Sequence, residues 1–411
     1  MVAPLRSALV RSLRIVVVLL VGLAGYGLGL LDDRRAAAEG SATYEQLDVF
    51  AEVLGLVQTR YVEDIDDTEL IRAGIRGMLT ELDPHSVFLG PSQLRAMRDD
   101  TRGEYVGVGI SIRESDGRIL VGEVFEGGPA FDAGMRSDDV IISVDGNDAT
   151  GLDSQGMVSR LRGPRGERVV IGIERETDAG PDQIEIPVIR DVIHTPAVVG
   201  SMPVEGIGVV RITSFQNNTG GELRSEIDSL QSEYGEELLG LVLDLRGNPG
   251  GLLNEAITVV DAFIPDGTIV STGGRLNADE TIARATRSGT RFRGPMVVLV
   301  DGGSASASEV VTGALQDYER ATVVGTLTYG KGSVQSIIDL RDGSGLKLTI
   351  SLYYTPLGRS INGEGITPDL TVLQATPAEG ETDDMPTVAT EAETVEDRQL
   401  QAALSLLLRQ D

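Results

Sequence analysis

The chain is 411 residues long and strongly acidic, with 35 lysine and arginine residues against 63 aspartate and glutamate residues and a formal net charge of −28. This length allows roughly two to four domains, and the charge argues against nucleic-acid binding, which needs a concentrated basic surface. The absence of cysteine excludes disulfides, cysteine-based metal sites and a thiol nucleophile. With only two histidines, His85 and His194, a histidine-rich metal site is nearly excluded as well. We therefore expect neither a metal nor a cofactor.

The N-terminal segment over residues 1–38 is typical of export. Three arginines precede an uncharged run over residues 15–31, and Ala36-Ala37-Ala38 supplies the small residues of a cleavage site. This run is long for a cleaved signal and short for a membrane span. Both a cleaved signal peptide and a retained inner-membrane anchor therefore stay open, and either one places the rest of the chain in the periplasm or cell envelope.

Changes in hydrophobic period divide the rest of the chain. Apolar residues at three- and four-residue spacing predict a helical N-terminal region over residues 40–102. Alternating apolar residues with Gly-Pro and Asp-Gly turns predict a small, mostly β unit over residues 103–190. Apolar strands that alternate with helices predict an α/β core with a mostly parallel sheet over residues 191–373. An acidic, disordered linker over residues 374–396 is expected to precede a short helix over residues 397–411.

The first candidate for chemistry is a burst of small residues between an apolar strand and a helix. Ser306 lies within Ser304-Ala305-Ser306-Ala307-Ser308-Glu309, where backbone amides converge at the positive end of the helix dipole and suit an oxyanion. Considered alone, this segment is a weak signal and favours a close-packed, capped turn that has no chemical role.

The second candidate is Lys331, which lies between two glycines directly before an apolar strand. Residues 325–331 approach the phosphate-binding pattern GxxxxGK, but Gly332 replaces the required serine or threonine and a strand follows instead of a helix. Nucleotide binding is therefore not expected. A buried lysine can instead lose its proton near neutral pH and activate a serine without any histidine. Considered alone, Lys331 is also compatible with an ordinary surface lysine.

The third candidate is the turn over Asp244–Gly251, which follows a buried strand and precedes a helix. It lies at the carboxyl edge of the predicted sheet, where open α/β folds bind ligands. Gly250 and Gly251 can donate a backbone N–H to a developing oxyanion there. A plain strand-to-helix turn is the alternative.

Together these segments resemble the C-terminal processing peptidases, a family of serine–lysine endopeptidases. The similarity spans about residues 44–373, and its motifs are LDPHS at 82–86, DLRGNPGG at 244–251, SASASE at 304–309 and TYGKGSVQ at 328–335. The resemblance implies a crotonase-like core in which Ser306 is the nucleophile and Lys331 its general base. It also implies that Gln335 positions the lysine and that the N–H groups of Gly251 and Ala307 form the oxyanion hole. On an ideal strand Gln335 would lie about 13 Å from Lys331, so their contact requires the glycine loop to fold back.

The family also carries a PDZ domain, which the resemblance places over residues 103–190. Its carboxylate-binding loop resembles Tyr105–Ile110, so Gly107, Val108, Gly109 and Ile110 are expected to bind the C-terminus of a peptide that adds as a strand. The expected partners are proteins or peptides with exposed C-termini, and a homo-oligomer or an adaptor protein stays open.

The resulting prediction is an exported serine endopeptidase that recognises C-terminal tails through its PDZ domain and cleaves through an acyl-enzyme. The alternative is a non-catalytic PDZ receptor or scaffold that binds protein C-termini. A crotonase-type acyl transferase is a third hypothesis, which rests on fold analogy. Acylating reagents distinguish the first two, because only the enzyme should be labelled at Ser306.

Overall fold

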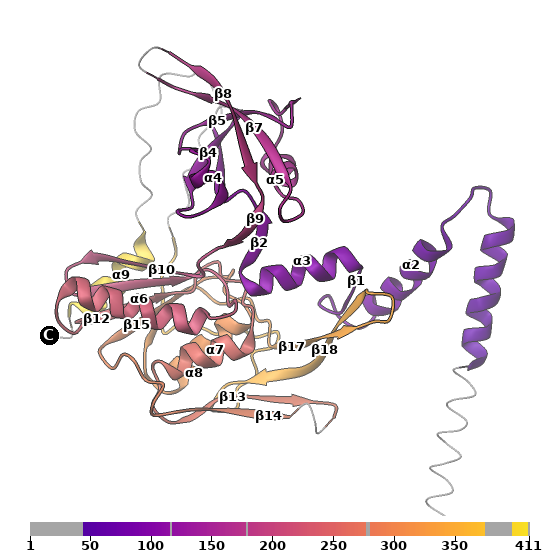
Figure 1. The fold of residues 1–411 in the computed structure, drawn as a ribbon. Helices are drawn as coiled ribbons and strands as arrows, with labels where there is room; N and C mark the ends of the chain where they lie inside the picture. Colours follow the sequence, from indigo (N-terminus) through magenta and orange to yellow (C-terminus); the bar gives the residue numbers. More distant parts are fainter. Residues whose placement is uncertain (1–43, 116, 178–179, 277–279, 375–396, 410–411) are drawn as a thin grey trace, which may run out of the picture. The chain divides into compact units, whose positions relative to one another are not determined.

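The computed structural model describes residues 44–115, 117–177, 180–276, 280–374 and 397–409, and the chain divides into two compact units (Figure 1). The described part of the first unit ends at Glu81, and the second unit begins at Leu82. The predicted signal or anchor over residues 1–38 lies outside the described residues, as does the predicted linker apart from Gln374. In the ranges given above, no helix is both long enough and apolar enough to cross a membrane.

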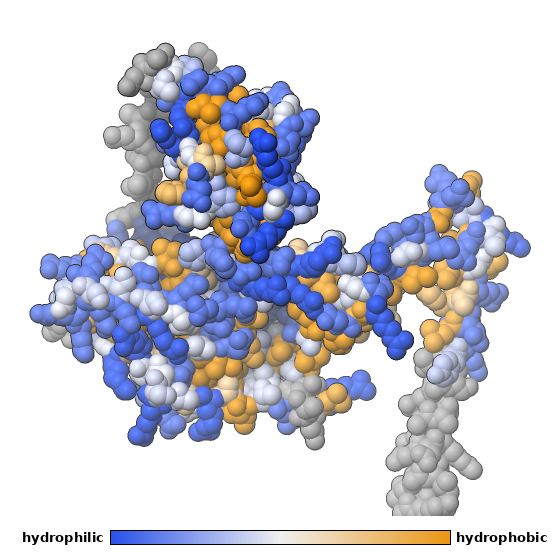
Figure 2. All heavy atoms as spheres, in the orientation of Figure 1, coloured by the Kyte–Doolittle hydropathy of each residue, from blue (hydrophilic) through white to orange (hydrophobic). Residues whose placement is uncertain are grey.

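The described part of the first unit consists of two helices. One spans residues 44–60, and α2 spans Asp67–Thr80. Asp66 caps α2, because its carboxylate accepts hydrogen bonds from the amides of Thr68 and Glu69. Figure 2 shows apolar atoms on the surface of these helices. The exposed apolar side chains include Leu47, Phe50, Val53, Leu56, Ile71 and Met78.

Within the second part of the chain, α3 spans Pro91–Arg102. A smaller, mostly β unit follows this helix. Its antiparallel sheet has the order β3-β4-β5-β7-β8, and β6 pairs with β5. The bounds are β3 Ile110–Ser115, β4 Arg118–Val124, α4 Pro129–Asp132, β5 Val140–Val144, β6 Asn147–Asp148, α5 Ser154–Leu161, β7 Arg168–Arg175 and β8 Asp182–Ile189. Alternate residues of these strands, among them Val121, Ile141 and Ile171, pack against Met157 of α5 in a core of their own. A ribbon of β2 (Glu104–Gly107) and β9 (Asp191–His194) joins the two ends of this unit.

A six-stranded sheet forms the centre of the remaining chain, in the order β10-β11-β12-β15-β16-β19. Every neighbouring pair from β11 to β19 is parallel, and only the first pair is antiparallel. The bounds are β10 Val198–Val204, β11 Ile207–Ile212, β12 Gly240–Asp244, β15 Met296–Val300, β16 Thr322–Gly325 and β19 Leu370–Thr371. The strands β12 and β15 are buried along their whole length, as expected for a sheet covered on both faces.

Helices cover both faces of this sheet. On one face, Leu243 and Val298 pack with α6 (Thr219–Tyr234), α7 (Leu253–Asp261) and α8 (Ala307–Asp317). On the other face, Val242 and Val297 pack against α9 (Arg398–Leu407). Because neighbouring residues of a strand point to opposite faces, this division follows directly from the sequence. The predicted C-terminal helix is therefore an integral layer of the core.

A second sheet makes the core mixed. Its order is β1-β18-β13-β14 with β17 beside β18, and every pair is antiparallel. The bounds are β1 Val87–Leu89, β13 Gly267–Gly274, β14 Thr281–Ala285, β17 Ser333–Asp339 and β18 Gly345–Tyr354. The prediction of a mostly parallel core is thus too simple, because the short connections between β13 and β14 and between β17 and β18 permit only antiparallel pairing. The resemblance of this core to the crotonase fold stays a prediction.

The LDPHS motif supports this second sheet. Asp83 accepts hydrogen bonds from the amides of His85 and Ser86 and from the Ser86 hydroxyl. The Ser86 hydroxyl in turn accepts a hydrogen bond from the Thr349 amide of β18. The region predicted to be helical over residues 40–102 therefore also contains a strand, β1. The turn of the LDPHS motif positions this strand beside β18.

Candidate active site

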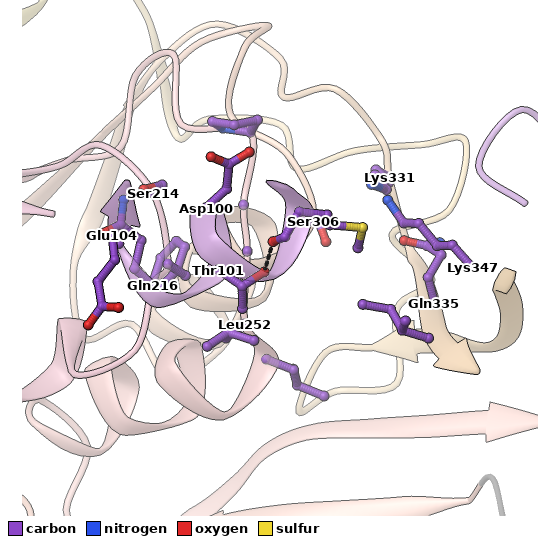
Figure 3. Close-up of a pocket in the computed structure, with 18 of the residues that line it drawn as sticks. Asp100, Thr101, Glu104, Ser214, Gln216, Leu252, Ser306, Lys331, Gln335 and Lys347 are labelled. Atoms are coloured by element: carbon purple, nitrogen blue, oxygen red, sulfur yellow. Dashed lines mark hydrogen bonds between the residues drawn. The ribbon is translucent and has the colours of Figure 1, made fainter. Parts of the chain in front are cut away.

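Three loops meet at the carboxyl edge of the parallel sheet. They follow β12, β15 and β16, which are adjacent strands, and they carry Gly251, Ser306 and Lys331. All three residues line one cavity of about 680 Å³ (Figure 3). Because the carboxyl ends of neighbouring parallel strands lie side by side, the sheet topology itself brings together residues that are 80 positions apart in the sequence.

Ser306 lies immediately before α8 in a strained conformation. Its φ of 57° and ψ of −112° lie outside the regions that non-glycine residues normally occupy. Its side chain faces the cavity, although the residue is only 7% exposed. The strain is held by tertiary contacts, which include a 3.0 Å hydrogen bond from the neighbouring Ala305 amide to the Asn248 carbonyl. A hydroxyl is thus presented at the N-terminus of a helix.

Glu309, a residue to which the sequence analysis assigned no role, connects the serine turn to the lysine turn. It is fully buried, and its Oε2 accepts hydrogen bonds from the amides of Ser306 at 2.8 Å and Lys331 at 2.9 Å. Its Oε1 accepts hydrogen bonds from the Gly330 amide at 2.7 Å and the Thr328 hydroxyl at 2.6 Å. Four donors on two oxygens suit a carboxylate, which has acceptors only. The signal in the sequence is the capping-box spacing of Ser306 and Glu309.

The Lys331 side chain is half-buried, and its environment favours the neutral amine. Burial lowers the pKa of Lys331 below its ordinary value, and the positive charge of Lys347 lowers it further, whereas the charge of Glu309 raises it. Among the described residues, the Lys331 amine has no hydrogen-bond or ion-pair partner, Ser306 included. The two side chains therefore line the same cavity without a hydrogen bond between them.

Two backbone amides are available to bind an oxyanion. Within the described residues, the N–H groups of Gly251 and Ala307 have no acceptor. Gly251 has a φ of +145°, and a Cβ there would lie 2.2 Å from the Phe215 carbonyl oxygen. At Gly250, with a φ of +102°, a Cβ would lie 2.7 Å from the Ala305 carbonyl oxygen. Gly250 is thus required for the turn to approach the serine, and Gly251 for it to pack against the Phe215 backbone.

Among the described residues, Gln335 forms no hydrogen bond with Lys331. Its amide donates hydrogen bonds to the carbonyl and hydroxyl of Ser333 and to the Thr349 hydroxyl. The pairing of β17 with β18 shifts in register at Val334 and Gln335, where Ile350 of β18 is the extra residue of a bulge. The side chain nevertheless lines the same cavity as Ser306.

Tyr353 and Lys347, both on β18, also line the cavity although the sequence analysis did not identify them. Burial raises the pKa of Tyr353 to about 12, and the hydrogen bond of its phenol with the Ser306 side chain acts in the opposite direction. The phenol is therefore protonated at neutral pH beside the serine. Neither residue has a local sequence signal, because their position depends on the pairing of β17 with β18.

The predicted carboxylate-binding loop joins β2 to β3. Val108 is buried, Gly109 has a φ of +82°, and the carbonyls of both residues accept hydrogen bonds from Ala130 and Phe125. In the part of the chain that the structure describes, the Val108 and Gly109 amides have no acceptor. Such unpaired amides suit a terminal carboxylate.

The described residues contain no group of three or more histidine, cysteine, aspartate or glutamate side chains that could hold a metal ion. The opposite side of the cavity from Lys331 is lined by Asp100, Glu104 and Gln216 (Figure 3). The cavity that contains Ser306 therefore has an acidic side and a cationic side.

Comparisons with known proteins identify several that are similar to this chain. Residues 206–372 match the family model described as peptidase family S41, residues 106–188 match a PDZ domain, and residues 31–92 match the N-terminal domain of the activating protease CtpB. A carboxy-terminal-processing protease of Bartonella bacilliformis is 44% identical over 338 residues, which are 82% of this chain and 77% of that protein. The carboxy-terminal processing protease CtpA of Bacillus subtilis is 33% identical over 82% of this chain and 70% of its own length. The structure of a photosystem II D1 C-terminal processing protease is 31% identical, with a TM-score of 0.45 over 79% of this chain and 92% of that one.

Proposed function

Because the chain belongs to peptidase family S41 and carries a PDZ domain, we propose that it is a serine endopeptidase with Ser306 as nucleophile and Lys331 as general base. The observation that carries this proposal is the common cavity, in which a strained serine at a helix N-terminus shares the space with a lysine whose surroundings favour the neutral amine.

In the proposed reaction, the Ser306 Oγ attacks the scissile carbonyl carbon while its proton moves to the Lys331 Nζ. The N–H groups of Gly251 and Ala307 stabilise the oxyanion. The lysine then gives its proton to the leaving amine, and the peptide C–N bond breaks to leave an acyl-enzyme. Water, activated by the neutral lysine, hydrolyses that ester and restores the serine.

The proton transfer requires the lysine amine to move to the serine hydroxyl. Four rotatable bonds give the lysine side chain this reach, and hydrogen bonds between catalytic groups often form only when substrate is present. The backbone of Lys331 is already tied to the serine turn through Glu309. A change of rotamer can therefore complete the pair without a rearrangement of the loops.

The proposed substrates are proteins with exposed C-terminal tails. The unpaired amides of Val108 and Gly109 would bind the terminal carboxylate, and the tail would add as a strand to the PDZ sheet. We further propose that the protein acts in the periplasm or cell envelope, because its basic, then apolar, N-terminal segment is typical of export. Association with the inner membrane through that segment and assembly with further copies or an adaptor belong to the same proposal.

The test is cleavage of an unfolded protein such as casein, combined with mass spectrometry after treatment with a serine-directed fluorophosphonate. We expect the wild-type protein to cleave the substrate and to carry one adduct on Ser306. Ser306→Ala should lose both properties, whereas Ser225→Ala, a matched change on the exposed surface of α6, should keep both. Turnover by Ser306→Ala would refute the proposal. Tail binding without product or adduct in the wild-type protein would favour the non-catalytic receptor.

A further inference from the structure

The chain contains only two lysines. Of its 35 lysine and arginine residues, 33 are arginine, and the two lysines are Lys331 and Lys347. Both line the cavity that contains Ser306, and Figure 3 shows them on the same side of that cavity together with Gln335. The chain therefore places both of its side-chain amines at this one site, although it uses arginine at every other cationic position.

The surroundings of Lys347 leave its charge unneutralised. It is a half-buried residue of β18, opposite Ile337 of β17 and Val87 of β1, both of which are apolar. Within the described ranges, neither Lys347 nor Lys331 forms an ion pair with a carboxylate. Two amines thus share a partly desolvated space.

Among the described residues, the other titratable groups near the two amines do not supply the electrostatic effect that Lys347 has on Lys331. Glu309 faces Lys331 from α8, but its carboxylate is already occupied by the three backbone amides and one hydroxyl described above. His85 lies within electrostatic range of both lysines, and Asp83 acts on His85 from the same turn. Burial first, and then Lys331, lower the pKa of His85, so its imidazole is neutral at neutral pH. Lys347 is therefore the cation that acts on Lys331.

We propose that Lys347 is a positioning residue of the peptidase site, whose ammonium charge favours the neutral Lys331 amine that accepts the Ser306 proton. The proposal rests on the proposed function. Two like charges in one partly buried cavity repel each other, so the pair releases its first proton more readily than an isolated lysine does. Burial also lowers the pKa of Lys331, so Lys331 is the one that loses it. The charge of the second lysine thereby adds to the effect of burial, which is the larger of the two.

The experiment measures the titration of Lys331 directly. The full-length protein is labelled with ¹³Cε-lysine, which gives two lysine signals, and Lys347→Met removes one of them and so identifies the other as Lys331. The pH dependence of that signal and of kcat/KM for a peptide substrate is recorded for the wild type, Lys347→Met and Lys347→Arg. Arg341→Met, which removes an exposed cation from the turn between β17 and β18, is the matched control.

In Lys347→Met we expect Lys331 to titrate at higher pH than in the wild type. The rising limb of kcat/KM should move in the same direction, with a several-fold loss at neutral pH that is recovered under alkaline conditions. Lys347→Arg, which retains the charge, and Arg341→Met should keep the wild-type titration. The same Lys331 titration in Lys347→Met as in the wild type would overturn the proposal, whether activity is unchanged or uniformly lower. Lys347→Gln provides the same test if the methionine variant does not fold, and full activity of Ser306→Ala would instead refute the proposed function itself.

Discussion

Replacement of Glu309 by glutamine tests whether one buried carboxylate holds the nucleophile turn and the lysine turn together. The amide would present one oxygen and one NH₂ group where the carboxylate presents two acceptors, so two of its four donors lose their partner. A hydrogen bond to a charged group contributes about 1.5–3 kcal/mol. We therefore expect the free energy of unfolding to fall by about 3–6 kcal/mol, and the melting temperature to fall by about 10 °C or more.

We expect Glu309→Gln to change two kinetic quantities, the plateau value of kcat and the pH at which activity rises. Because the backbones of Ser306 and Lys331 are no longer fixed to each other, the plateau value of kcat should fall, by about 100-fold for a misplacement near 1 Å. Because the charge of Glu309 raises the pKa of Lys331, its removal should lower that pKa, so the rising limb of the pH profile should move to lower pH. This shift is opposite to the one expected for Lys347→Met.

The assay for Glu309→Gln is the pH dependence of kcat and kcat/KM at a temperature below the melting point of the variant. Differential scanning calorimetry on the same samples measures the loss of stability. Glu233→Gln, on the exposed surface of α6, is the control and should match the wild type in all three quantities. A Glu309→Gln protein with the wild-type melting temperature and the wild-type plateau would show that the carboxylate does not organise the site.

Two further substitutions test the oxyanion turn and the C-terminal helix. Gly251→Ala should reduce kcat by about 100-fold or more, because its Cβ would meet the Phe215 carbonyl oxygen at 2.2 Å; steady-state kinetics with near-normal activity would contradict this account of the turn. The pKa of Asp397 is lowered to about 2, against a burial effect that raises it, by hydrogen bonds from Arg246, the Leu400 amide and Gln374. Its ionised form therefore stabilises the fold above the unfolded-state pKa near 3.8, and that stability is lost as the pH falls towards 2. Asp397→Asn should cost about 1 kcal/mol at pH 7 once solvent screening is considered, and less at about pH 3; equal differences in urea unfolding at both pH values would exclude the effect.

Residue motifs predicted the loops of the site better than they predicted its side-chain contacts. The sequence analysis placed only the Gly251 turn at the carboxyl edge of the sheet, and the strand order of the structure shows that the loops with Ser306 and Lys331 lie at the same edge. The contacts of Gln335 depend on a register shift between β17 and β18, where β18 has one extra residue, Ile350, and no local sequence pattern predicts this shift. Lys347 reaches the cavity only because β17 and β18 pair along a register that places it opposite Ile337. Such positions are properties of strand pairing, and a single sequence does not specify them.

The way in which the three loops are connected identifies the part of the site that is free to move. The Asn248 carbonyl accepts hydrogen bonds from the Ala305 amide and the Ser308 hydroxyl, which fixes the oxyanion turn to the serine turn. Glu309 and a 3.0 Å bond from the Tyr329 amide to the Ser304 carbonyl fix the lysine turn to the serine turn. Backbone hydrogen bonds therefore fix every loop, whereas the Lys331 amine at the end of a flexible side chain has no partner among the described residues. In a site built this way, burial and then the opposing charges of Lys347 and Glu309 set the pKa of the lysine, and the rotamer of one side chain decides whether the amine reaches the serine.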